Sequence, residues 1–121
     1  MRIARRLRAR PEAAGQAREL VRELDVSPRQ GTDATLLLSE VVTNSVRHAG
    51  LDDDDAIEVV LDAGDVLRVE VRDRGAGFER GDPKPEPERP SGWGLYLVEQ
   101  LADRWGVERG PPTTVWFELG A

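Results

Sequence analysis

Apolar and polar residues alternate along several segments of the chain, which is the period of a strand with one buried face. The segments are residues 2–9, 57–61, 67–71 and 114–119. Ala63-Gly64-Asp65 joins the second segment to the third in a hairpin-like pattern, so we expect these two strands to pair antiparallel. The last segment is expected to pair with Val107-Glu108.

Between these strands, apolar residues recur at three- and four-residue spacing, which predicts helices. One helix is expected from Pro11 to near Asp25, and Ser27-Pro28 is interpreted as a break after it. A second is expected from about Thr32 to Ala49, closed by Gly50 and the acidic residues 52–55, which are interpreted as a solvated loop rather than a metal site. A third is expected from Gly94 to about Arg104. This order predicts an α+β fold, a two-layer sandwich of a mostly antiparallel sheet with helices packed on one face.

Composition narrows the class of protein. At 121 residues the chain is expected to form a single domain, 1–121, and it has no apolar run near the ~20 residues that cross a bilayer. We therefore expect a soluble protein without a membrane contact. The sequence has no cysteine, which fits a reducing cytoplasm. Its net charge of −6 argues against direct nucleic-acid binding.

Residues 79–90 (ERGDPKPEPERP) are charged and rich in proline, and they carry no apolar residue from which to build a core. We expect a mobile loop here, within a lid at about 79–91. Lys84 is the only lysine of the chain, so any further phosphate clamp has to come from arginine or from backbone N–H groups.

Candidate chemistry begins on the second helix, where Glu40, Asn44 and His48 recur every four residues and share one face. An amide oxygen can ligate Mg²⁺ while nucleotide oxygens supply negative charge, and the neighbouring carboxylate is then free to take a proton. Taken alone, this face also fits the solvated side of an ordinary amphipathic helix.

The second candidate is Asp73-Arg74-Gly75-Ala76-Gly77, directly after a predicted strand. The glycines allow a close approach of backbone to a ligand, and Asp73 can accept a hydrogen bond from an amino group on a flat base. An ordinary turn is the competing interpretation.

The third candidate is Ser91-Gly92-Trp93-Gly94-Leu95, which opens the last helix. N–H groups at a helix N-terminus, reached closely because of the glycines, form a phosphate site, although glycine-rich helix starts are common. Neither glycine pair completes a Rossmann motif, since Arg80 and Leu97 stand at the third positions, and no glycine precedes a lysine as in a P-loop.

In this order the three motifs resemble the Bergerat (GHKL) ATP-binding superfamily of gyrase-type ATPases, histidine-kinase catalytic domains and anti-sigma-factor serine/threonine kinases. Residues 39–49 (SEVVTNSVRHA) resemble its N box, Asp73 to Gly77 its G1 box, and Gly92 to Leu95 its G2 box. The resemblance covers nearly the whole chain, including Thr114 to Leu119. The small size and the absence of a phosphoacceptor helix, transmembrane segment or transducer domain favour the anti-sigma-kinase branch.

The resemblance implies ATP and Mg²⁺ as cofactors and a role for each motif. Asn44 would ligate Mg²⁺, Glu40 would be the general base, and Asp73 would accept from adenine. The remaining nucleotide contacts would come from the base-and-ribose wall of Gly75 and Gly77, the phosphate-binding Gly92 and Gly94 with Trp93 and Leu95, Thr114 acting through water, and Arg47 and His48 near the site.

The expected function is therefore that of a kinase that phosphorylates a serine or threonine of an anti-sigma-factor antagonist and also sequesters a sigma factor, which regulates transcription by partner switching. Whether it acts as a homodimer stays open. Trp93 stands where many relatives carry a polar or basic residue, so the alternative is a non-catalytic, ATP-dependent binding module. A detached histidine-kinase catalytic domain is a third candidate.

Overall fold

A computed structural model describes residues 1–48, 52, 54–73, 90–110 and 112–121, with the backbone alone at 48 and 90–94. In chain order its elements are β1 (Arg2–Arg8), α1 (Ala13–Val21), α2 (Pro28–His48), β2 (Ala56–Ala63), β3 (Val66–Asp73), α3 (Pro90–Leu101), β4 (Arg104–Glu108) and β5 (Thr113–Gly120). The expected lid at about 79–91 lies almost wholly outside these residues, as do Ala49 and Gly50.

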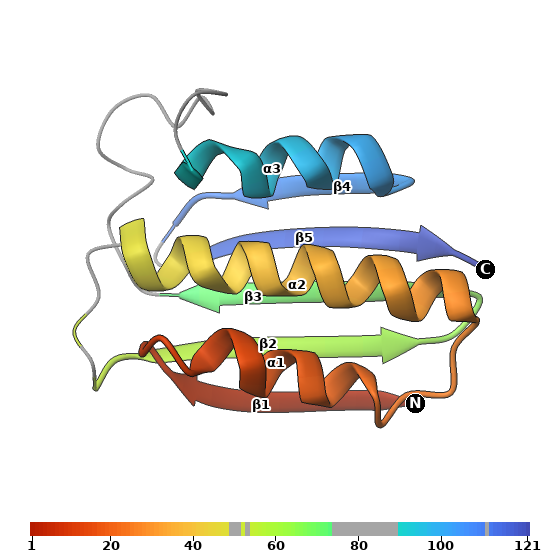
Figure 1. Cartoon of the computed structure of the whole chain (residues 1–121), viewed down its shortest axis with the longest axis horizontal. Helices are drawn as coiled ribbons and strands as arrows, with labels where there is room; N and C mark the ends of the chain where they lie inside the picture. Colours follow the sequence, from red (N-terminus) through yellow and green to blue (C-terminus); the bar gives the residue numbers. More distant parts are fainter. Residues whose placement is uncertain (49–51, 53, 74–89, 111) are drawn as a thin grey trace.

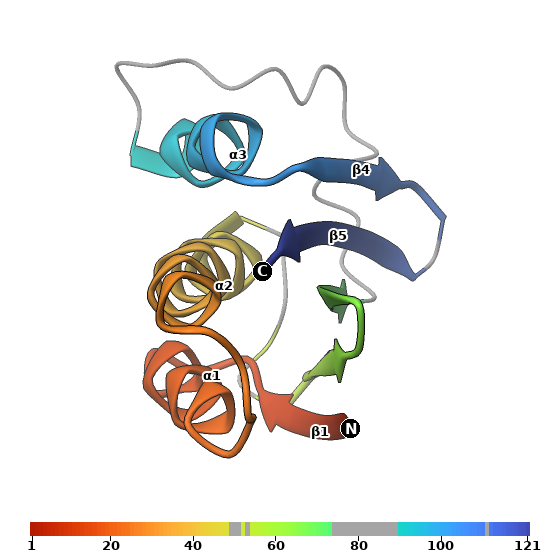
Figure 2. The same ribbon diagram turned by 90° about the vertical axis from the view of Figure 1, so that its right-hand side faces the viewer.

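Within the described residues, five strands form one sheet in the order β1-β2-β3-β5-β4, and every neighbouring pair is antiparallel (Figure 1). The three helices lie on one face of this sheet, as the edge-on view in Figure 2 shows. The predicted α+β sandwich with helices on one face is thus confirmed. Only Gly64 and Asp65 separate β2 from β3, so the predicted hairpin is also present.

The core fills the space between the helix layer and the sheet. Alternate residues of β3 face it, and Leu67, Val69 and Val71 are fully buried there. Leu37 and Val42 of α2 cover them from the helix side. Burial of an aliphatic side chain of this size stabilises a fold by roughly 1.5–3 kcal/mol, so this layer contact holds the α2 helix against the sheet. No helix in the described part of the chain is long and apolar enough to span a bilayer.

The α2 helix begins earlier than expected, at Pro28 instead of Thr32. Ser27 caps it: the Ser27 hydroxyl accepts from the backbone N–H of Gln30 at 3.2 Å, and the Gln30 side chain accepts from the backbone N–H of Ser27 at 3.1 Å. This is a capping box with proline in the first turn, so the residues interpreted as a break are the start of the helix. Gln30 also donates to the carbonyl of Leu119 at 3.0 Å, which ties the start of α2 to β5.

The other helices also differ from expectation at their ends. The α1 helix is shorter, Ala13–Val21. The α3 helix starts at Pro90, before the glycines, because proline suits the first turn. It ends at Leu101, and Arg104, which was expected to end the helix, begins β4 instead. The backbone N–H of Asp103 already donates to the carbonyl of Glu118 in β5 at 2.9 Å.

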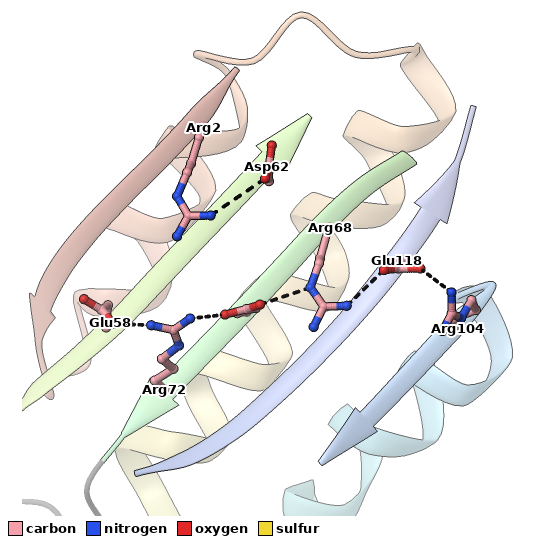
Figure 3. A network of polar contacts seen from close by, with 8 residues as sticks. Arg2, Glu58, Asp62, Arg68, Arg72, Arg104 and Glu118 are labelled. Atoms are coloured by element: carbon pink, nitrogen blue, oxygen red, sulfur yellow. Dashed lines mark hydrogen bonds and ion pairs between the residues drawn. The ribbon is translucent and has the colours of Figure 1, made fainter. Parts of the chain in front are cut away.

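The face of the sheet away from the helices carries a chain of alternating charges, which we call the open-face network (Figure 3). It runs through Glu58, Arg72, Glu70, Arg68, Glu118 and Arg104 across four strands. Arg72 meets Glu58 at 2.9 Å, and Arg68 meets Glu118 at 2.9 Å. Glu70 is bonded by both arginines. The guanidinium of Arg68 also lies 4.3 Å from the centre of the Trp116 ring, within cation–π range.

Partial burial opposes ionisation of Glu70, but the hydrogen bonds and charges of Arg68 and Arg72 outweigh it, so its pKa lies below the ordinary value. A lowered pKa in the folded state contributes stability above the unfolded pKa of about 4.3, and this contribution is lost as pH falls through the folded value. We expect Glu70→Gln to reduce the free energy of unfolding by about 1–2 kcal/mol at pH 7, with a smaller difference at pH 3.

Urea unfolding of both proteins at the two pH values measures this difference. Glu108→Gln is the matched control, because Glu108 is an exposed glutamate at the end of β4, outside the network. A loss of stability that is equal at pH 7 and pH 3 would show that the charge of Glu70 does not contribute.

Candidate functional site

The end of β3 presents a buried carboxylate. Asp73 is the last residue of the strand and is only 3% exposed. Alternation along β3 puts its side chain on the same face as Val69 and Val71, beneath the helices. In the register of the sheet, Asp73 stands between Ile57 of β2 and Thr113 of β5. A carboxylate in this place is shielded from bulk water and can direct its oxygens to a specific donor.

Thr113 is the polar neighbour of Asp73 in this row. It is 1% exposed, and its hydroxyl oxygen is buried without a hydrogen-bond partner among the described residues. Leaving a buried hydroxyl unpaired costs about 1–3 kcal/mol, so such groups usually meet a bound water or a ligand. The pair of Asp73 and Thr113 is therefore suited to hold a flat polar molecule, or a water bridging to one, at the end of the sheet.

Thr114, the threonine expected to contact the nucleotide through water, does not lie beside Asp73. It stands opposite Arg72, in step with Trp116 and Glu118, and so belongs to the open face of the sheet, away from Asp73. Thr113 is the residue that sequence reasoning missed. Its parity with the apolar Val115 and Phe117 could have identified it, because residues two apart on a strand share a face.

Glu40 and Asn44 lie one turn apart in the second half of α2, and both are half-buried. The α2 helix contacts β3 and β5 below it and α3 beside it. Figure 1 shows the end of α2, the end of β3 and the starts of α3 and β5 at the same end of the molecule. The helix face and the Asp73–Thr113 pair therefore belong to one region. Arg47 is exposed near the end of α2, and His48 is its last residue.

The first turn of α3 reaches this same end. Gly92 lies in its first turn, where backbone N–H groups without a partner inside the helix and the helix dipole favour an anion, and Trp93 and Gly94 follow it. Leu95, the next residue, is half-buried against the core and anchors the helix start. Gly75 and Gly77 lie outside the described residues, so the base-and-ribose wall stays a prediction.

The donor set fits the groups that the resemblance implies. Asp73 and the Thr113 hydroxyl, which has no hydrogen-bond partner among the described residues, fit a base with an exocyclic amine. The Asn44 amide oxygen fits Mg²⁺ held mainly by phosphate oxygens and water. Among the described residues, no three acidic, histidine or cysteine side chains gather as a metal site of their own.

Comparisons with known proteins identify the family and the fold of the chain. The family described as the histidine kinase-like ATPase domain matches residues 4–118. The chain is 30% identical to the serine-protein kinase RsbW of Oceanobacillus iheyensis, covering 84% of this chain and 75% of that protein. It is 34% identical to the anti-sigma F factor of Geobacillus stearothermophilus, covering 81% of this chain and 75% of that protein.

Among solved structures, the chain is similar to the RsbU and RsbW domains of Rv1364c from Mycobacterium tuberculosis, with a TM-score of 0.75 and 23% identity. The match covers 99% of this chain and 32% of that one. A histidine kinase domain from Erythrobacter litoralis EL346 matches with a TM-score of 0.64 and 24% identity, covering 94% of this chain and 61% of that one. These two likenesses concern the fold.

Proposed function

Because the chain belongs to the histidine kinase-like ATPase family and is an anti-sigma-factor kinase-like member of it, we propose that it binds ATP with Mg²⁺ and phosphorylates a serine or threonine of an antagonist protein. The same domain would bind a sigma factor, and phosphorylation of the antagonist would control which partner it holds. The observation that carries the nucleotide site is the buried Asp73 beside the Thr113 hydroxyl, which finds no hydrogen-bond partner in the described part of the chain.

Each group of this site has a distinct task. The Asp73 carboxylate accepts a hydrogen bond from the exocyclic amine of adenine, and the Thr113 hydroxyl supports the same contact. Asn44 offers an amide oxygen to Mg²⁺, which when bound neutralises charge on the phosphates. The N–H groups at the start of α3 point to where the phosphates would lie. Glu40 takes the proton of the acceptor hydroxyl as its oxygen attacks the terminal phosphorus and ADP leaves.

Incubation with ATP labelled on the terminal phosphate and candidate antagonist proteins tests the proposal. Transfer of label to a serine or threonine of one antagonist is the expected result. One sequence feature supports a second candidate function, namely Trp93 between Gly92 and Gly94, where a cation would help to neutralise the terminal phosphate. If ATP changes partner affinity and no label is transferred, the domain is a nucleotide-dependent binding module.

The two threonines at the start of β5 provide a matched pair. Thr113→Val keeps the shape of the side chain and removes the hydroxyl beside Asp73, so ATP affinity should fall about three- to tenfold, the effect of one hydrogen bond. Thr114→Val should leave ATP affinity unchanged, because Thr114 lies across from Arg72 on the open face. Isothermal titration calorimetry measures both. Equal ATP affinity in the two variants would show that the Thr113 hydroxyl does not support the adenine contact.

Asn44→Ala separates the contribution of Mg²⁺ to ATP affinity from the contribution of the adenine contacts. A site with few protein ligands has little to replace a lost one, so ATP affinity in Mg²⁺ should fall about tenfold or more. In EDTA, the wild type and the variant should bind ATP with the same weakened affinity, because the amide then has no metal to hold. Wild-type affinity of the variant in Mg²⁺ would show that this helix face is an ordinary solvated surface.

A further inference from the structure

The outer edge of the sheet carries a concentration of arginine that the nucleotide site does not use. The first ten residues contain five arginines and no acidic residue, although the whole chain has a net charge of −6. In the described sheet, Arg2–Arg8 form β1, the edge strand, which pairs with β2 alone. Figure 2 shows β1 at the margin of the sheet with α1 beside it. In the strand order, β2 separates β1 from β3, the strand that ends at Asp73.

A surface hollow of about 390 Å³ follows this edge, and we call it the arginine groove. It is lined by the consecutive residues 5–8, together with Arg10 and residues of the facing part of α1. Successive residues of a strand point to opposite faces of the sheet. Because all four residues 5–8 line the groove, the groove lies at the rim of the sheet and not on one face. Four of its lining residues are arginines, and Glu12 is the acidic one.

Three of the four groove arginines have an acidic partner among the described residues, but these ion pairs are either long or shared. Arg8 and Arg10 share one oxygen of Asp54, at 3.1 and 3.3 Å, and Asp54 is itself 82% exposed. Arg5 reaches Glu23 only at 3.8 Å, and Arg6 has no ion pair in the described part of the chain. The Nε of Arg10 is buried and lacks an acceptor there. The groove thus offers more donors than the neighbouring carboxylates accept.

We propose that the arginine groove binds an acidic peptide segment of a protein partner. Arginine forks pair with carboxylates through two parallel hydrogen bonds, and a row of them along an edge strand fits an extended chain with acidic side chains. A second copy of β1 fits poorly, because pairing two such strands would bring their arginines close together. A nucleic acid is disfavoured by the net charge of the whole molecule. This site goes beyond the proposed kinase function, since it requires no nucleotide.

The test uses a fluorescein-labelled dodecapeptide of alternating glutamate and serine, with the same peptide carrying glutamine in place of glutamate as its control. Arg6→Gln and Arg8→Gln remove guanidinium groups from the groove. Arg22→Gln is the matched control, because Arg22 is 81% exposed after α1, outside the groove, and pairs with Glu19. Fluorescence anisotropy is recorded at 50 and 300 mM salt, with and without ATP, and on the Asp73→Asn protein.

The glutamate peptide should bind, more weakly at the higher salt, and each groove variant should lose about two- to fivefold in affinity, the range for exposed ion pairs. Arg22→Gln and Asp73→Asn should bind it as the wild type does, so failure of the nucleotide site leaves this result unaffected. The proposal is overturned if the glutamine peptide binds equally, or if Arg22→Gln loses as much as Arg6→Gln. Tighter binding of duplex DNA, or a self-association abolished by Arg6→Gln, would overturn it as well.

Discussion

Replacing Glu40 with glutamine is expected to lower the rate of phosphoryl transfer by about 10²- to 10⁴-fold, the usual contribution of a general base. Glutamine keeps the size of the side chain and its ability to hydrogen-bond, but it cannot take a proton. ATP affinity should stay within about twofold of the wild type, because the proposed role of Glu40 is on the acceptor hydroxyl and not on the nucleotide. Single-turnover transfer of label from ATP to the antagonist measures the first effect, and calorimetry with ATP measures the second.

Glu99→Gln is the control for this experiment, since Glu99 is an exposed glutamate on α3. It should transfer phosphate at the wild-type rate. A Glu40→Gln protein with wild-type transfer would exclude Glu40 as the base, whereas equal losses in transfer and in ATP affinity would place it on the nucleotide or the metal.

Asp73→Asn is expected to weaken ATP binding by about 10²-fold or more. The substitution replaces a charged carboxylate with a neutral amide, which keeps one acceptor oxygen but puts an N–H₂ group in place of the other. Asp73 is 3% exposed, so water cannot freely replace the lost acceptor. Guanine does not present an amine in the same place, so the wild type should prefer ATP to GTP and the variant should lose that preference. Calorimetry with both nucleotides measures the change.

Because Asp73 is buried, the variant needs a check on its fold. Thermal unfolding and near-ultraviolet circular dichroism should show a folded protein, and Asp73→Ala should behave alike in binding. If the folded Asp73→Asn protein bound ATP as tightly as the wild type, the adenine would not be held at the end of β3.

Local pattern was sufficient to predict most of the architecture. Alternation located the strands, because one face of each is buried, and helical spacing located α1 and α2. The start of α2 was misjudged because Ser27 and Pro28 are typical both of turns and of helix N-termini, and the reciprocal bonds between Ser27 and Gln30 decide between them. The α3 helix was expected to start later than it does for a similar reason, because a proline such as Pro90 can either interrupt a helix or begin one.

The site was predictable only in part, because it depends on which strands stand side by side. Glu40, Asn44 and Asp73 could be selected from spacing and from position at a strand end. The parity of Thr113 with Val115 and Phe117 marks its face of the strand, but its place beside Asp73 required the register of β5 against β3, which pairs residues forty or more apart in sequence. The open-face network was not foreseen for the same reason, since Arg68 and Glu118 meet only through that pairing.

The alternating charges of the open face also limit how the β2–β3 hairpin can assemble. In the native register Glu70 stands opposite Val60, with Glu58 and Asp62 two positions away on either side. A slip by two residues would keep the apolar positions facing the core, so hydrophobic burial alone discriminates poorly against it. Either direction of that slip brings Glu70 opposite an acidic residue, Glu58 in one case and Asp62 in the other, and like charges in facing positions are destabilising. Misaligned hairpins are therefore penalised while the chain folds, before the helices have covered the sheet.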